Sequence, residues 1–186
     1  MPSNPLRIAA FGVYLGSWLV LASAAIASAF PRLRQVSDAV NIGASAPVII
    51  GTLLQIAAAA MITVSMNAGS LHPEIWELVG TLLLAPFGAS LFVWAIWSAP
   101  SDADVLVTVG AYRWLRHPMY LSLFAMLLAT GLLASSGMIL LAAAGCYLVG
   151  SKLRIDWEEA ELVRKFPIDF PRYSLRTPWR CLPGLW

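Results

Sequence analysis

Long uncharged stretches separate short polar segments in the first hundred residues of the chain. No charged residue occurs from Ile8 to Phe30 or from about 44 to 67, and only one occurs from about 75 to 98. At about 1.5 Å of helical rise per residue, each stretch can cross a hydrocarbon core roughly 30 Å thick. The pattern predicts three membrane-spanning helices, the third bracketed by Trp76 and Trp97 as if by two aromatic belts.

The apolar pattern resumes later in two shorter segments. They run from Met119 to Ala134 and from Met138 to Gly150, and a tight Ser-Ser-Gly turn joins them. Such a pair predicts an antiparallel helical hairpin. We therefore expect an all-α integral membrane protein with about five transmembrane helices, the last two a short helical hairpin, and a cytoplasmic C-terminal tail. The first stretch is too long for a cleaved signal peptide and is counted as a retained span.

The basic residues predict the orientation of these spans, because positively charged loops tend to stay in the cytoplasm. If the amino terminus is outside and five spans follow, all of the 12 Lys and Arg residues except Arg7 lie on the inner side. The loop from Ala68 to Glu74 contains no Lys or Arg, as this orientation requires. We expect the C-terminal region, and any cofactor site within it, to be cytoplasmic.

Composition narrows the class of protein and locates its chemistry. The 186 residues are 59% hydrophobic and only 12% charged, which excludes the polar outer surface of a soluble protein. The net charge of +2 gives no reason to expect nucleic acid, and no spacing of Cys or His suggests a metal site. Residues 1–100 are predicted to be a scaffold of three transmembrane helices. Residues 101–186 alternate polar segments with the hairpin, and we expect cofactor binding and catalysis there.

A basic cluster stands at the start of the hairpin, in "RWLRHPMYLS". Pro118 suits the first position of a helix, so His117 is expected at or beside the N-cap, with Tyr120 near the same face. The free amide groups of a helix start, together with Arg113 and Arg116, favour a carboxylate or phosphate. The cluster therefore predicts an anion site.

The opposite charge appears in "KLRIDWEEAELVRKF", directly after the fifth apolar segment. Basic and acidic residues four apart suit a solvated helix, namely Lys152 with Asp156, Arg154 with Glu158, and Glu161 with Lys165. Glu159 has no such partner. If the hairpin is antiparallel, the start of its first helix lies beside the end of its second, and His117 and Tyr120 should meet the acidic group.

Two segments of the second region together resemble a known family. "GAYRWLRHPMY", followed after the hairpin by "WEEAELVRKFPIDFPRYSLRTP", resembles the C-terminal region of the isoprenylcysteine carboxyl methyltransferases and their phospholipid N-methyltransferase relatives. The shared pattern is roughly Gly-x-Tyr-Arg-x-x-Arg-His-Pro-x-Tyr, then a Glu-Glu pair, then a tyrosine and an Arg-x-Pro. The resemblance covers Gly110 to about Pro178 and leaves the first three helices unexplained.

The resemblance implies an integral membrane methyltransferase that uses S-adenosylmethionine as its cofactor. It implies cofactor-binding roles for Gly110, Tyr112, Arg116, His117, Pro118, Tyr120, Glu158, Glu159 and Tyr173. It also implies catalytic roles for Glu159 and Arg176. The arginine either closes the cofactor pocket from the tail, together with Tyr173, or holds the acceptor in line with the methyl group. Which of the two neighbouring glutamates binds the cofactor is left open.

The expected acceptor is lipophilic or partitions into the membrane, as a small molecule or a lipidated partner, and carries a carboxylate, amine or thiol. Membrane lipid is a further expected partner. The sequence does not indicate an oligomeric state. Two alternatives remain open. One is a sterol-reductase-like membrane enzyme, which shares a similar Arg-His-Pro-x-Tyr pattern but uses NADPH. The other is a non-enzymatic membrane subunit whose hairpin supports a partner.

Overall fold

The chain folds almost entirely into helices. The computed structural model describes residues 5–32, 45–68, 73–99, 105–182 and 184, and no strand occurs among them. The elements are α1 (Pro5–Arg32), α3 (Ala46–Ala68), α4 (Ile75–Ser98), the short 3-10 helix η2 (Gly110–Arg113), α5 (Pro118–Leu133), α6 (Gly137–Lys165) and α7 (Asp169–Arg176). Every predicted apolar segment is helical, which confirms the all-α class.

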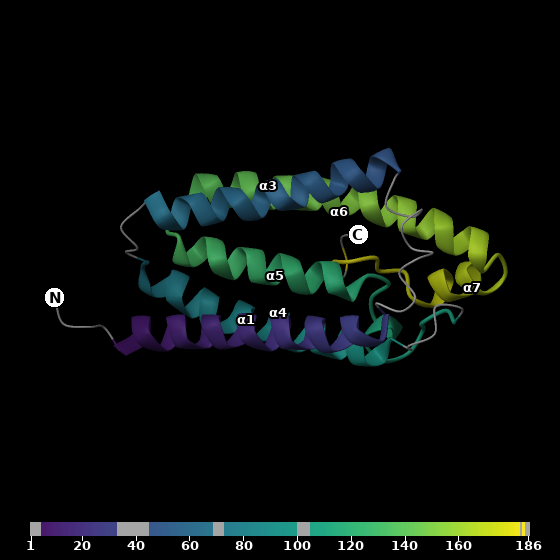
Figure 1. The fold of residues 1–186 in the computed structure, drawn as a ribbon, viewed down its shortest axis with the longest axis horizontal. Helices are drawn as coiled ribbons and strands as arrows, with labels where there is room; N and C mark the ends of the chain where they lie inside the picture. The colour runs from purple at the N-terminus through teal and green to yellow at the C-terminus, as the bar shows by residue number, and fades with distance from the viewer. Residues whose placement is uncertain (1–4, 33–44, 69–72, 100–104, 183, 185–186) are drawn as a thin grey trace.

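The long helices α1, α3, α4, α5 and α6 run in alternating directions along one axis (Figure 1). α3 and α6 lie side by side in one layer, α1 and α4 in another, and α5 runs between them. One apolar cluster joins α5 to α1 and α4 and includes Leu21 and Met126. A second joins α5 to α3 and α6 and includes Ile62, Leu127 and Tyr147. α5 is therefore the central helix of the bundle.

The backbones of α3 and α6 approach each other closely at two glycines. A Cβ atom at Gly51 would lie 2.6 Å from the carbonyl oxygen of Gly150, and the reverse distance is also 2.6 Å. Small residues permit this kind of contact between membrane helices. The crossing also brings the side chain of Arg154, on α6, against α3.

The hairpin agrees with its prediction in both its turn and its second helix. The turn lies where expected, with Ser135 in a left-handed conformation at φ 50°. α6 continues without a break to Lys165, so the apolar segment and the polar segment predicted as its solvated extension are one helix of 29 residues. No Pro or Gly interrupts it after Gly150. Ion pairs from Lys152 to Asp156 and from Arg154 to Glu158 support the extension.

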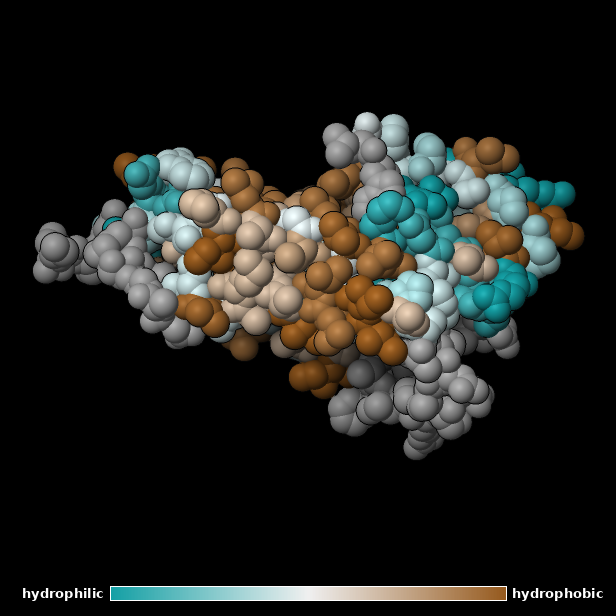
Figure 2. Space-filling model, turned by 90° about the horizontal axis from the view of Figure 1, so that it is seen from above, coloured by the Kyte–Doolittle hydropathy of each residue, from teal (hydrophilic) through white to brown (hydrophobic). Residues whose placement is uncertain are grey.

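Within the described residues, four helices are long and apolar enough to cross a membrane: α1, α3, α4 and α6. α5 has 16 residues and spans only about 24 Å at the usual helical rise. Large apolar side chains are exposed along the bundle, including Leu19, Leu83 and Leu141. Figure 2 shows apolar groups over the middle of the molecule and hydrophilic groups gathered at the end where α7 lies.

The described basic side chains lie at opposite ends of the bundle. Arg7 is in the first turn of α1, at the end away from α7. Those of η2, of the second half of α6, of α7 and of the tail lie at the other end. Three parts of the chain that also bear on the predicted orientation lie outside the described residues. They are the side chain of Arg32, residue Arg34 and the loop positions 69–72.

Candidate active site

The start of α5 is fastened to the C-terminal tail. Pro118 occupies the first turn and His117 is the N-cap residue, as predicted. The backbone N–H of Arg116 donates to the carbonyl oxygen of Trp179 at 3.0 Å, and that of His117 donates to the carbonyl oxygen of Arg180 at 2.8 Å. The tail therefore returns to the point where the Arg-His-Pro motif begins.

Glu159 is the centre of a charged network at this point, and its side chain is only 9% exposed. One carboxylate oxygen lies 3.2 Å from Nη1 of Arg116 and 3.3 Å from Nε2 of His117. The other lies 2.8 Å from Nη2 of Arg180. The predicted meeting of the helix start with the acidic group is confirmed. The anion beside the helix start is, however, the protein's own carboxylate, whose oxygens already have cationic partners.

Glu158 is the next residue, yet its side chain is 31% exposed and its contacts are different. The hydroxyl of Tyr120 donates to one carboxylate oxygen, and Nδ1 of His117 lies 3.5 Å from the other. Nη2 of Arg154 lies 3.6 Å away, and its guanidinium group is stacked 5.6 Å from the centre of the Tyr120 ring. Glu158 is thus held in place while remaining accessible.

The imidazole of His117 lies between the two carboxylates. Burial opposes its protonation, but hydrogen bonds to Glu158 and Glu159 and their negative charges outweigh burial and raise the pKa of His117 above its ordinary value. A proton on His117 therefore links α5 to α6.

A cavity of about 280 Å³ opens beside these groups. Its walls are formed by Val105, Leu106, Val107, Tyr112, Arg116, His117, Pro118, Met119, Tyr120, Glu158, Leu162, Lys165, Phe166, Phe170 and Tyr173. Apolar and aromatic walls with a few convergent polar groups are typical of small-ligand sites. Glu158 lines this cavity, whereas Glu159 lies behind it.

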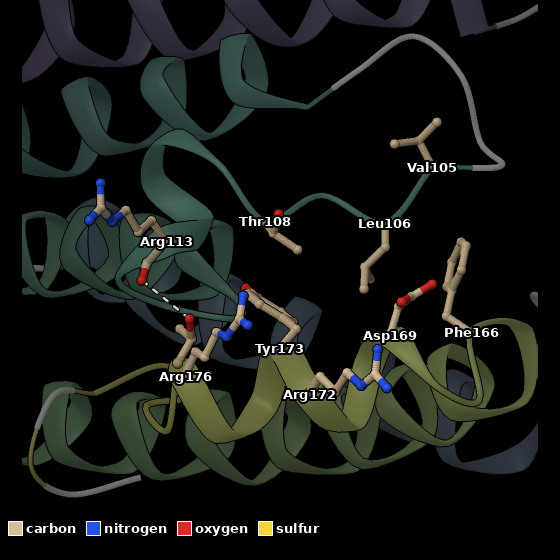
Figure 3. Close-up of a pocket in the computed structure, with 10 residues that line it drawn as sticks. Val105, Leu106, Thr108, Arg113, Phe166, Asp169, Arg172, Tyr173 and Arg176 are labelled. Atoms are coloured by element: carbon tan, nitrogen blue, oxygen red, sulfur yellow. Dashed lines mark hydrogen bonds between the residues drawn. The ribbon is translucent and has the colours of Figure 1, made fainter.

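A larger groove of about 880 Å³ shares four wall residues with this cavity, namely Val105, Leu106, Phe166 and Tyr173. Figure 3 shows it between α7 and the segment that leads into η2. Arg176 lines this groove rather than the cavity. Its expected role toward the acceptor stays a prediction.

Of the other expected residues, Tyr112, Pro118 and Tyr173 line the cavity, whereas Gly110 does not. Gly110 begins η2 at φ 61°, and a Cβ atom there would lie 1.9 Å from Oγ of Ser98, so only glycine fits. The carbonyl oxygen of Tyr112 accepts a hydrogen bond of 2.6 Å from the hydroxyl of Tyr173. Burial raises the pKa of Tyr173, which keeps this donor protonated. η2 is thereby tied to α7.

Two residues of the site were missed by the sequence analysis. Arg180 binds Glu159 and also lies 2.8 Å from Oδ1 of Asp156. Arg154 was assigned only to a solvated pair with Glu158, but it also donates to Oε1 of Gln55 on α3 at 3.2 Å. One hint of the role of Arg180 was present in the sequence, namely that it directly follows the Thr-Pro-Trp segment of the tail.

The chain matches a family model described as phospholipid methyltransferase over residues 48–168. The match extends from α3 to the residue before α7, and therefore includes both the Arg-His-Pro motif and the glutamate pair. No curated protein and no solved structure gives a significant match.

Proposed function

The chain belongs to the phospholipid methyltransferase family, whose members are membrane methyltransferases, and on that premise we propose that it uses S-adenosylmethionine to methylate a lipophilic acceptor. The observation that carries the proposal is the cavity at which His117, Tyr120 and Glu158 converge. All three residues lie within the matched part of the chain. Tyr173 and Arg176 lie beyond it.

The residues around the cavity fit the chemical groups of this cofactor, which has a carboxylate, an ammonium, a ribose and an adenine. Nε of Arg116 is buried and has no hydrogen-bond partner among the described residues, so its N–H can serve a carboxylate. Glu158 can accept hydrogen bonds from the ammonium or the ribose hydroxyls. The rings of Tyr112, Phe166 and Phe170 offer flat walls to the adenine.

We assign different roles to the two glutamates. Glu158 faces the cavity and is proposed to bind the cofactor. Glu159 is proposed to position Arg116 and His117, since both its oxygens are engaged by protein cations. When bound, the cofactor supplies the electrophilic methyl group. The chain then contributes orientation of the reacting pair and exclusion of water.

We propose that the acceptor comes from the bilayer and the cofactor from the cytoplasm, with the amino terminus outside. The described basic residues other than Arg7 lie at the end of the bundle that holds the site, which supports this orientation. Labelling of single cysteines introduced at His72 and in the tail tests it. Accessibility of both from the same side would contradict it.

Ligand-induced thermal shifts of the purified protein in detergent test the proposed cofactor. S-Adenosylmethionine and its demethylated product should each raise the melting temperature in a concentration-dependent way, because ligands that bind only the folded state stabilise it. NADPH should not. Stabilisation by NADPH alone would favour the reductase alternative, and the absence of any shift would favour the non-enzymatic one. Transfer of a labelled methyl group to extracted lipid would then identify the acceptor fraction.

A further inference from the structure

The side chain of Arg154 lies against α3 at the point where α3 and α6 approach most closely. A Cβ atom at Gly51 would lie 2.7 Å from Cγ of Arg154, which is closer than Cβ atoms come to other carbon atoms in real structures. The stem of the arginine therefore passes through space that only a glycine at position 51 leaves open. The crossing of the two helices thus directs Arg154 along α3.

Two polar side chains of α3 receive the guanidinium group. Nη1 of Arg154 donates to Oε1 of Gln55 at 3.2 Å and lies 3.4 Å from Oγ1 of Thr52. Both partners are themselves held in place. Nε2 of Gln55 donates to Oγ of Ser151 on α6 at 3.0 Å, and the hydroxyl of Thr52 donates to the carbonyl oxygen of Val48 at 2.8 Å. α3 therefore fixes one side of the guanidinium group.

The other side of the guanidinium group contacts residues of the proposed cofactor site. Nη2 of Arg154 lies 3.6 Å from Oε1 of Glu158, which is also the oxygen that accepts from the hydroxyl of Tyr120. The guanidinium carbon lies 5.6 Å from the centre of the Tyr120 ring, which is the geometry of a cation–π contact. Tyr120 and Glu158 line the cavity of about 280 Å³, whereas Arg154 is not among the described residues that line it.

We propose that Arg154 is a positioning residue for cofactor binding and that it connects α3 to the carboxylate of Glu158. The proposal rests on the methyltransferase function proposed above. A guanidinium group suits this task, because its planar fork serves two partners in fixed directions at once. A carboxylate side chain that is free to move loses rotamer freedom when it binds a ligand, and one that is held in advance avoids that loss.

This role also gives α3 a part in the site. The family match begins at residue 48 and therefore includes Thr52 and Gln55, although neither is among the described residues that line the cavity of about 280 Å³. Through Arg154, a substitution on α3 is expected to change the affinity for a ligand that α3 does not touch.

Calorimetric titration of S-adenosylmethionine into variants of the full chain tests the proposal. Arg154→Gln should weaken binding about three- to thirtyfold, as expected for side chains coupled in one network. Arg154→Lys should lose less, since it keeps the charge but not the fork. Gln55→Met should also weaken binding. Arg164→Gln is the matched control, an exposed arginine of the same helix, and should bind normally. Unchanged affinity in Arg154→Gln would overturn the proposal.

A double variant separates positioning from a general loss of structure. If Arg154 acts through Glu158, adding Arg154→Gln to Glu158→Gln should weaken binding by no more than about twofold beyond Glu158→Gln alone. Losses that multiplied would show that the two residues act independently, and they would overturn the positioning role.

A fluorine resonance measured without ligand separates this proposal from the proposed function. 3-Fluorotyrosine at position 120 places the probe on the ring that Arg154 stacks on. Arg154→Gln and Gln55→Met should both shift or broaden its resonance in detergent, and Arg164→Gln should not. If the resonance responded in this way but the unmodified protein bound no S-adenosylmethionine, the methyltransferase proposal would fail and the anchoring by Arg154 would stand. If S-adenosylmethionine bound but Gln55→Met changed neither resonance nor affinity, the connection to α3 would be overturned.

Discussion

The surroundings of Glu159 and Glu158 differ sharply, although the two residues are adjacent on α6. Glu159 is 9% exposed and meets Arg116, His117 and Arg180, whereas Glu158 is 31% exposed and lines the cavity of about 280 Å³ in which we propose that the cofactor binds. The carboxylate of Glu159 is buried and has three cationic partners of the protein, so it is less available to a ligand than that of Glu158. The contrast supports a structural role for the network around Glu159. It supports a ligand-binding role for the surroundings of Glu158.

The largest expected effect is on stability, in the Glu159 region. Glu159→Ala leaves three cationic side chains beside one another without their shared carboxylate, and such losses cost about 3 kcal/mol or more. Thermal unfolding in detergent should show a melting temperature lower by about 6 to 12 °C. Glu161→Ala removes an exposed carboxylate from the same helix and should change it little. Equal melting temperatures for the two variants would contradict the structural role assigned to Glu159.

Arg180→Gln should destabilise the protein by about 2 kcal/mol, since it removes charge-assisted hydrogen bonds to Asp156 and Glu159. The corresponding fall in melting temperature is about 4 to 8 °C. Arg164→Gln is the control, because Arg164 is 73% exposed and pairs only at the surface. If the control lost as much stability, the tail would have no special part in the network.

A pH effect is expected from His117, which faces Glu158, Glu159, Tyr120 and Arg116. Its folded pKa is raised above its unfolded value of about 6.5, so the stabilisation is full below that pH. It is lost as the pH rises through the folded pKa. His117→Gln should remove this decline from a series of thermal unfolding curves. An identical decline in the variant would show that another group titrates.

The smallest effect concerns the wall of the cavity in which we propose that the cofactor binds. Tyr173→Phe removes the hydrogen bond to the carbonyl oxygen of Tyr112 and should cost about 1 kcal/mol, or about 2 to 4 °C in melting temperature. Ser174→Ala, on the exposed side of α7, is a matched control. A larger loss in the control would mean that α7 is held by other contacts.

Local patterns of the sequence predicted the helices well. The third predicted span and α4 have the same bounds, 75–98, because an apolar run with a single charged residue, bracketed by tryptophans, marks both ends. The extension of α6 past Gly150, where the apolar period ends, was predicted from the basic and acidic residues four apart, which suit a solvated helix. α6 packs chiefly along α3, and α5 along α4. Neither pairing could be inferred from the short turn between α5 and α6.

The sequence also predicted that His117 and Tyr120 meet the glutamate pair, because an antiparallel hairpin requires it. It could not distinguish the two glutamates, since neighbouring positions on a helix point in directions about 100° apart and only the packing shows which faces inward. Arg180 was missed for a related reason. Its approach depends on backbone hydrogen bonds from residues 116 and 117 to the tail, and no sequence period records such bonds.

The most direct test of the account is calorimetric titration of S-adenosylmethionine into Glu158→Gln, with Glu161→Gln as the control and the melting temperature measured on the same samples. A charged hydrogen bond is worth about 1.5 to 3 kcal/mol, so Glu158→Gln should bind about 10 to 100 times more weakly than the unmodified protein. Its melting temperature without ligand should be nearly unchanged. Unchanged affinity in Glu158→Gln would contradict the proposed binding role of Glu158.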